Sequence, residues 1–197
     1  EFTEFNRAVA RESITLLKNS GGALPLRKNA RILVTGPTAD LLSVLNGGWT
    51  ITWQGNEEER YPKDKPTILR AIRSVAGPAN VAYVPGTTFT TAIDIPAAVA
   101  AAQASDVVVA CLGEPAYCET PGNIDDLALD EAQIQLVDAL AASGKPIVVV
   151  LAEGRPRLIH RIVEKVQGIL AAFLPGMEGG RATAEILFGD AVPSGKL

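Results

Sequence analysis

Two uninterrupted apolar runs constrain the fold of this chain more than any other feature. They are VVVA within residues 106–114 and IVVVLA within residues 145–156. Neither run alternates between apolar and polar residues, as a strand with one face in water would. Short β-branched runs of this kind are typical of strands that are buried on both faces. We therefore expect these two segments to form the centre of a sheet that is covered on both sides.

Amphipathic segments alternate with short apolar runs along the rest of the chain. Further strands are predicted within 31–37, 80–86 and 168–176, and helices within 66–77, 95–105, 129–144, 158–166 and 178–190. This alternation predicts an α/β fold with a mainly parallel sheet flanked by helices on both faces, a three-layer α/β sandwich of the flavodoxin-like type.

The first twenty residues are expected to form an amphipathic helix that the pair Gly21-Gly22 ends. The apolar residues that recur at roughly helical spacing are Phe5, Val9, Ile14, Leu16 and Leu17. No initiator Met and no secretion signal precede this segment, and the chain stops shortly after a turn. We therefore expect a piece of a longer polypeptide.

Composition excludes several classes of function. The 197 residues include 18 Lys and Arg against 22 Asp and Glu, a net charge of −4 with no basic run, so no nucleic acid is expected as a partner. No apolar run reaches the roughly 18 residues that a membrane-spanning helix needs, so we expect no membrane partner. Two cysteines and one histidine are too few for a disulfide scaffold or a histidine-rich centre, so we expect no metal.

A nucleotide-binding turn is one interpretation of the segment VTGPTAD (34–40). A glycine between a strand and a helix can present backbone N–H groups to phosphate. The segment lacks the G-x-G-x-x-G pattern, however, and Pro37 removes the amide that would follow Gly36. We expect a tight turn here, and a flavodoxin-like nucleotide binder remains as a weaker alternative.

Two acidic residues, Glu114 and Glu119, lie in the loop that follows the strand within 106–114. Ligands of open parallel sheets bind beyond the carboxyl ends of the strands. Partial desolvation, here by Tyr117 and Pro121, raises the pKa of a carboxyl group and can let it act as an acid near neutral pH. Loop glutamates that serve only solubility are the alternative.

The chain has only two tryptophans, Trp49 and Trp53, and both lie in GGWTITWQG (47–55). Two aromatic rings in a loop-rich setting suit stacking against a sugar ring or another flat ligand. The flanking glycines favour an exposed loop, so we expect a ligand-stacking role. Packing in the core or at an interface is the alternative.

Several segments carry a combined pattern: GGWTITWQG, LGEPAYCET, LAEGRP, FLPGMEGG and ILFGDAVPSGKL. Together they resemble the C-terminal α/β sandwich domain of glycoside hydrolase family 3, in its β-glucosidase and exo-β-glucanase branch. RESITLLKNSGGALPL is similar to the segment that links the family's barrel to this domain. The resemblance implies that residues 1–28 are a linker helix after an N-terminal (β/α)8 barrel of the same polypeptide, and that residues 29–197 are the sandwich domain.

The resemblance also implies retaining hydrolysis of terminal β-D-glucosyl residues by two carboxylates about 5–5.5 Å apart. Glu119 would be the acid/base, with Glu114 as the runner-up, and Trp53, supported by Trp49, would contact the aglycone. The nucleophile would be an aspartate of the barrel, so this chain alone is expected to be inactive. The implied substrate is a β-glucoside or β-glucan oligosaccharide, the implied location is periplasmic or secreted, and no cofactor is implied.

Some features depart from the family pattern or allow another function. Asp126 lies where a basic or amide residue is common, and Cys118 beside Glu119 is not expected. Cys118 could pair with Cys111 only if the loop folds back, so two free thiols are favoured. Arg155 and Glu178 recur in such sequences and are expected to hold loops and helix starts. The alternative function is a non-catalytic carbohydrate-binding or scaffolding module.

Overall fold

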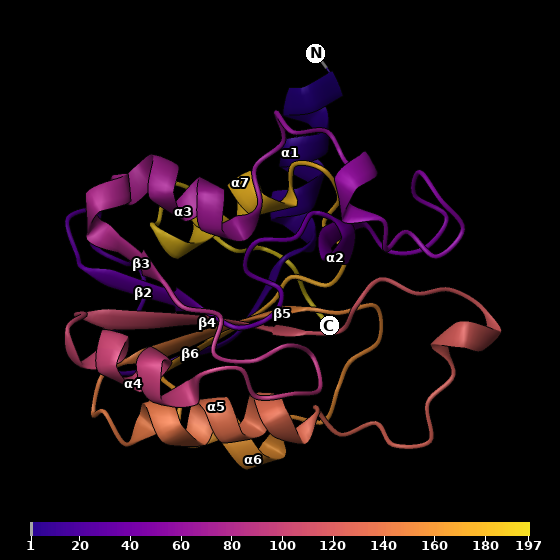
Figure 1. Cartoon of the computed structure of the whole chain (residues 1–197). Helices are drawn as coiled ribbons and strands as arrows, with labels where there is room; N and C mark the ends of the chain where they lie inside the picture. The colour runs from indigo at the N-terminus through magenta and orange to yellow at the C-terminus, as the bar shows by residue number, and fades with distance from the viewer. Residues whose placement is uncertain (1) are drawn as a thin grey trace.

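The computed structural model describes residues 2–197, and a six-stranded sheet runs through its centre (Figure 1). The strand order is β1-β6-β5-β4-β2-β3, in which β2 to β6 run parallel and β1 runs antiparallel to β6. Every residue of β4 and β5 is buried, as their uninterrupted apolar runs predict. The strands are β1 (Thr15–Asn19), β2 (Ile32–Thr35), β3 (Val81–Tyr83), β4 (Val107–Gly113), β5 (Ile147–Ala152) and β6 (Gly168–Ala171).

Helices cover both faces of the sheet, which confirms the predicted three-layer fold (Figure 1). One face carries α1 (Phe2–Ser13), α2 (Ser43–Asn46), α3 (Ile68–Ala76) and α7 (Gly179–Leu187), and the other carries α4 (Ile95–Gln103), α5 (Glu131–Ala141) and α6 (His160–Val163). Short 3-10 helices are η1 (Glu58–Arg60), η2 (Pro78–Asn80) and η3 (Thr120–Gly122). Within residues 2–197, no helix combines the length and apolarity needed to cross a bilayer.

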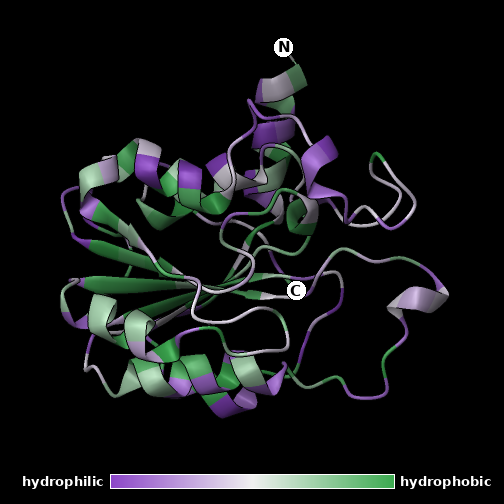
Figure 2. Ribbon diagram, in the orientation of Figure 1, coloured by the Kyte–Doolittle hydropathy of each residue, from purple (hydrophilic) through white to green (hydrophobic). Residues whose placement is uncertain are grey.

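Successive side chains of β4 pack on opposite faces of the sheet. Val109 and Cys111 pack in the core beneath α3 and α7, whereas Val108, Ala110 and Leu112 pack in the core beneath α4 and α5. Because side chains alternate across a strand, burial of both faces requires an apolar residue at every position. Figure 2 shows this as a hydrophobic central sheet between helices whose hydrophilic residues lie outward.

Side chains at helix starts explain where several helices begin. Thr67, Asp94 and Asp130 precede α3, α4 and α5, and each side chain accepts a hydrogen bond from a backbone N–H of the first turn. Glu178, buried before α7, accepts from Lys65 Nζ at 2.6 Å. It thereby ties α7 to the segment before α3, in line with the expected role of this glutamate.

The N-terminal segment differs from the expectation. The helix ends at Ser13 and does not continue to Gly21, because residues 15–19 form β1 along the edge of β6. The predicted helix is therefore wrong beyond residue 13. Leu16 and Leu17 fit a helical spacing, but pairing with β6 satisfies the backbone groups of this segment and covers an otherwise free sheet edge.

The strand order reverses between β2 and β4, which are neighbours although β3 lies between them in the chain. In open α/β sheets, ligand sites lie beyond the carboxyl ends of the strands at such a reversal. The turn after β2 packs closely here: Gly36 has φ +92°, and a Cβ at this position would lie 2.1 Å from the carbonyl oxygen of Cys111. This confirms the tight turn predicted for residues 34–40.

Candidate active site

The Trp loop, residues 47–55, follows α2 and folds back on itself. The N–H of Trp49 donates to the carbonyl oxygen of Trp53 at 2.8 Å. Gly55 has φ +70°, and a Cβ there would lie 2.0 Å from the carbonyl oxygen of Gly47, so only glycine allows the loop to close this tightly. Trp49 is 70% exposed and Trp53 is 48% exposed. The exposed loop expected from the flanking glycines is confirmed.

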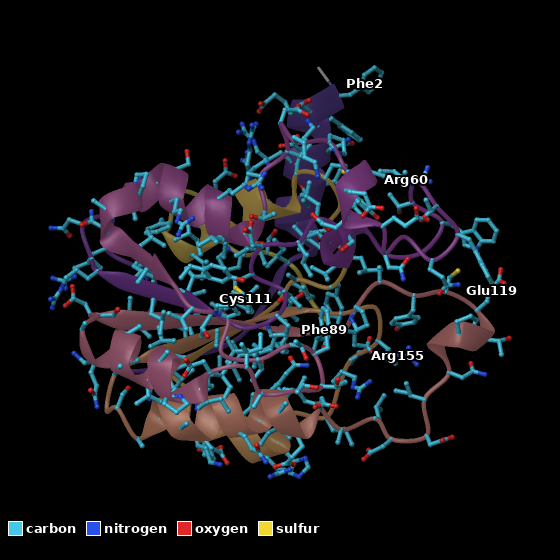
Figure 3. The ribbon with its side chains drawn as sticks, viewed as in Figure 1. Phe2, Arg60, Phe89, Cys111, Glu119 and Arg155 are labelled. Atoms are coloured by element: carbon cyan, nitrogen blue, oxygen red, sulfur yellow. The ribbon has the colours of Figure 1, made fainter. Side chains whose placement is uncertain are left out.

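The acid loop, residues 114–128, continues from the carboxyl end of β4. Figure 3 shows Glu119 at the outer tip of this loop, with Arg155 closer to the sheet. Glu119 is exposed, and its backbone has φ 54° and ψ −151°, a conformation that residues other than glycine rarely adopt. Asp126 accepts a hydrogen bond from a backbone N–H two residues on, at 2.8 Å, and so stabilises a turn of the loop.

The Trp loop and the acid loop meet at a seam, which Trp53 and Gln54 form with Cys118. Gln54 and Cys118 are 64 positions apart in the chain. Oε1 of Gln54 accepts from the N–H of Cys118 at 3.0 Å, and Nε2 of Gln54 donates to its carbonyl oxygen at 3.2 Å. The Cys118 thiol donates to the carbonyl oxygen of Trp53 at 3.0 Å. A Cβ on Gly48 would lie 2.5 Å from Cys118 Cβ, so the loops touch directly.

Ion pairs hold the base of the acid loop in place. Glu114 is 5% exposed, and its Oε1 lies 3.0 Å from Nε of Arg155 and 2.8 Å from Nη1 of Arg157. Arg155 also donates to the hydroxyl of Tyr117 at 2.7 Å and to the carbonyl oxygen of Gly122 at 2.6 Å. Its guanidinium stacks 4.0 Å from the centre of the Tyr117 ring. Arg155 therefore holds the loop, as expected for this residue.

Glu153, at the end of β5, belongs to the same charge cluster and was not singled out by the sequence. It is 3% exposed, and Oε1 accepts from the backbone N–H of Arg157 at 3.3 Å, whereas Oε2 is buried without a hydrogen-bond partner. Burial raises the pKa of this carboxyl from 4.5 to about 7, and the neighbouring Glu114 charge adds to the rise. Only its position at a strand end could have indicated it.

A pocket of about 280 Å³ lies beside the base of the acid loop. Its wall includes Phe89 and Gln133 as well as Glu114 and the two arginines. The Gln133 amide is fully engaged: it donates to the carbonyl oxygens of Phe89 and Gly113 and accepts from the N–H of Gly113. These contacts tie the pocket wall to Gly113, the residue directly before the acid loop.

Both cysteines are free thiols. Cys111 is buried in β4, and Cys118 lies at the seam. Burial raises the pKa of both thiols, and the Glu119 carboxylate adds to the rise at Cys118. A protonated thiol suits the hydrogen bond that Cys118 donates at the seam. Across residues 2–197, no group of three or more His, Cys, Asp or Glu side chains is placed to hold a metal ion.

Comparison with known proteins points to one family for this chain. Residues 14–197 match the family model described as "Glycosyl hydrolase family 3 C-terminal domain". A lysosomal beta glucosidase of Dictyostelium discoideum is 42% identical over 96% of this chain, and a periplasmic beta-glucosidase of Salmonella typhimurium is 35% identical over 97%. The chain spans only 24% and 27% of the lengths of these relatives.

A solved structure shows the same architecture. The crystal structure of a beta-glucosidase from Listeria innocua in complex with isofagomine superimposes with a TM-score of 0.85 at 36% identity. The match covers 98% of this chain and 26% of that one. With nearly the whole chain matched in sequence and in structure, the chain belongs to glycoside hydrolase family 3, as its C-terminal domain.

Proposed function

We propose that this chain is part of a retaining β-glucosidase or exo-β-glucanase that hydrolyses terminal β-D-glucosyl residues. In this proposal Glu119 is the acid/base, and Trp53, supported by Trp49, contacts the aglycone. The observation that carries the proposal is the seam, since Glu119 directly follows the residue that is bonded to the exposed Trp loop. An exposed carboxyl on the residue after this junction, with the two exposed rings on the adjoining loop, suits protonation of a bound sugar's leaving oxygen.

The surroundings of the two loop glutamates favour Glu119 as the acid over Glu114. Glu114 is buried, and two guanidinium groups bind its carboxylate. Both of its oxygens are engaged, Oε1 by the two guanidinium groups and Oε2 by the backbone N–H of Arg155, so this carboxyl group is not free to meet a substrate. Glu119 is exposed at the tip, where a substrate can reach its carboxyl group. The base glutamate thus supports the loop, and the tip glutamate performs the chemistry.

The proposed mechanism has two steps. In the first, Glu119 gives its proton to the glycosidic oxygen as the bond from that oxygen to the anomeric carbon breaks, while a second carboxylate bonds to the anomeric carbon. In the second, the Glu119 carboxylate takes a proton from water as the water oxygen attacks the same carbon and displaces the second carboxylate. Retention requires the two carboxyl groups to lie about 5–5.5 Å apart.

We assign the second carboxylate to an aspartate of an N-terminal (β/α)8 barrel in the same polypeptide. In this division, residues 1–28 link the barrel to the sandwich domain of residues 29–197, and residues 15–19 of the linking segment also form β1 at the edge of the sandwich sheet. The length of the relatives, about four times that of this chain, supports a further domain. Two of those relatives are named periplasmic and lysosomal, and we propose a periplasmic or secreted location for this enzyme.

The decisive experiment replaces Glu119 by Ala in the full-length polypeptide that carries this domain. Loss of the acid should reduce kcat/KM about 10²–10⁴-fold on an alkyl β-glucoside, whose leaving group needs a proton. On a dinitrophenyl β-glucoside, whose leaving group departs unaided, the first step should be nearly unaffected. Azide should restore turnover by replacing water as the nucleophile. An exposed glutamate beyond α6 provides the matched control, Glu164→Ala, which should leave both rates unchanged.

Two results would contradict the proposal. A uniform rise in KM on both substrates, without azide rescue, would show that Glu119 only binds sugar and would favour the non-catalytic carbohydrate-binding module. Turnover of an aryl β-glucoside by this chain alone, well above the buffer rate, would refute the assignment of the nucleophile to a separate barrel. We expect no such turnover from the isolated chain.

A further inference from the structure

Gln54 makes the most specific contact between the two loops of the site. Its side-chain amide accepts from the N–H of Cys118 at 3.0 Å and donates to the carbonyl oxygen of the same residue at 3.2 Å. This is the pair of hydrogen bonds that a neighbouring strand would offer. Nε2 also lies 3.3 Å from the Cys118 sulfur. One side chain therefore satisfies both backbone groups of the residue that precedes Glu119.

The backbone of Glu119 needs such support. Its φ of 54° and ψ of −151° lie in a region that is nearly restricted to glycine. A residue with a Cβ keeps this conformation only where its surroundings hold it. On the far side of the tip, the N–H of Gly122 donates to the Glu119 carbonyl oxygen at 2.9 Å. On the near side, the support comes from the two hydrogen bonds of Gln54 to the Cys118 backbone and from the Cys118 thiol, which donates to the carbonyl oxygen of Trp53 at 3.0 Å.

The Trp loop that carries Gln54 is itself fixed. The hydroxyl of Tyr61, which is 2% exposed, donates to the carbonyl oxygen of Gly55 at 2.7 Å, directly after Gln54. Gly48 lies so close to the acid loop that a Cβ would fall 2.6 Å from the Tyr117 carbonyl oxygen. Trp49 and Ile51 in this loop also have positive φ, 58° and 66°, so Gln54 joins two loops that both need their backbone held from outside.

We propose that Gln54 is a positioning residue that sets the direction of the Glu119 carboxyl relative to Trp53. The inference rests on the proposed role of Glu119 as acid/base, and it adds a residue that touches neither the substrate nor the reacting atoms. By fixing Cys118 at both backbone groups, Gln54 couples the aromatic surface for the aglycone to the proton donor. A shift of the donor by about 1 Å can reduce a rate by roughly 10²-fold, so this coupling affects catalysis.

The test is Gln54→Met in the full-length polypeptide, because Met keeps the length of the side chain but makes neither hydrogen bond. We expect kcat/KM on an alkyl β-glucoside to fall about tenfold, and kcat/KM on a dinitrophenyl β-glucoside to fall less than about threefold. Gln135→Met makes the same change at an exposed position of α5 and should alter neither rate. If Gln54→Met does not fold, Gln54→Glu retains the acceptor for Cys118 N–H and should give the same leaving-group pattern in weaker form.

A double-mutant cycle separates positioning from a merely structural role. In the Glu119→Ala background, Gln54→Met should change the alkyl β-glucoside rate less than about twofold, because there is no carboxyl left to position. An equal loss in both backgrounds, or an equal loss on both substrates, would overturn the inference while leaving the role of Glu119 intact. If Glu119→Ala itself shows no leaving-group dependence, it is the proposed function that fails.

Discussion

Two glutamates of the acid loop, one at its base and one at its tip, have opposite surroundings. At the base, Glu114 is buried and paired with two arginines that follow β5. At the tip, Glu119 is exposed on a strained backbone, and the bonds that hold it are made by the main chain of its neighbours. The difference separates a part of the loop that is fixed by ion pairs from the exposed part to which we assign the acid/base. Ion pairs stiffen the base, and the carboxyl at the tip is left free.

The largest expected effect tests whether the base supports the fold. Glu114→Gln removes one charge and leaves Arg155 and Arg157 without their carboxylate partner. Breaking a buried ion pair typically costs 3–5 kcal/mol, and because both arginines keep some solvent exposure we expect a loss of about 3 kcal/mol. Urea unfolding of the variant and the wild-type chain measures this difference. The matched change at the tip, Glu119→Gln, should cost less than about 0.5 kcal/mol.

A similar loss in the free energy of unfolding for Glu114→Gln and Glu119→Gln would contradict the distinction between base and tip. A large loss for Glu119→Gln alone would reverse it.

The next effect concerns the pH dependence of the base. Glu153 has a pKa raised to about 7, mainly by burial, against 4.5 for an ordinary glutamate. The folded chain therefore keeps a proton between these values that the unfolded chain has lost, so the free energy of unfolding falls as pH rises from about 4.5 to 7. The contribution is at most about 3 kcal/mol. Glu153→Gln cannot ionise, so the variant should match the wild type near pH 4 and be more stable near pH 8.

Thermal unfolding of both proteins across this pH range measures the effect. The exposed Glu164→Gln serves as the control and should show no trend. A stability difference between Glu153→Gln and the wild type that stays constant from pH 4 to pH 8 would contradict the raised pKa.

A prediction for the aromatic part of the tip sharpens the comparison further. Trp53→Ala removes a half-exposed ring, so the free energy of unfolding should change by less than about 1 kcal/mol. In the full-length polypeptide, loss of one stacking surface should raise KM for an aryl β-glucoside about three- to tenfold with little change in kcat. Trp49→Ala, which removes the ring proposed to support Trp53, should have a smaller effect. Unfolding curves and steady-state kinetics together decide whether the tip serves binding or folding.

Most of the fold follows from local patterns in the sequence. The runs in β4 and β5 are apolar at every position because both faces are buried, and capping residues such as Asp130 mark helix starts. The prediction was wrong at β1, because Leu16 and Leu17 satisfy a helical spacing as well as an extended one. Only the free edge of β6, a feature of the assembled sheet, decides between them.

The site was less predictable than the fold, because its contacts join distant segments. Glu119, Trp49 and Trp53 could be singled out by residue type and resemblance. The bond from Gln54 to Cys118 could not, since no local pattern shows which loop a glutamine side chain will meet across 64 positions. Glu153 was missed for a related reason, because its raised pKa depends on burial in the assembled structure.

The tight approach at Gly48 has a consequence for how specificity can be changed. With no space for a Cβ between the loops, neither loop can be replaced without altering the shape of the other. Residues 47–55 and 114–128 therefore form the smallest unit that can be exchanged between family members. Grafting the tryptophan segment alone would therefore misplace Glu119, the proposed proton donor, whereas grafting both segments together would keep the proposed aglycone surface and the proposed acid/base in their mutual arrangement.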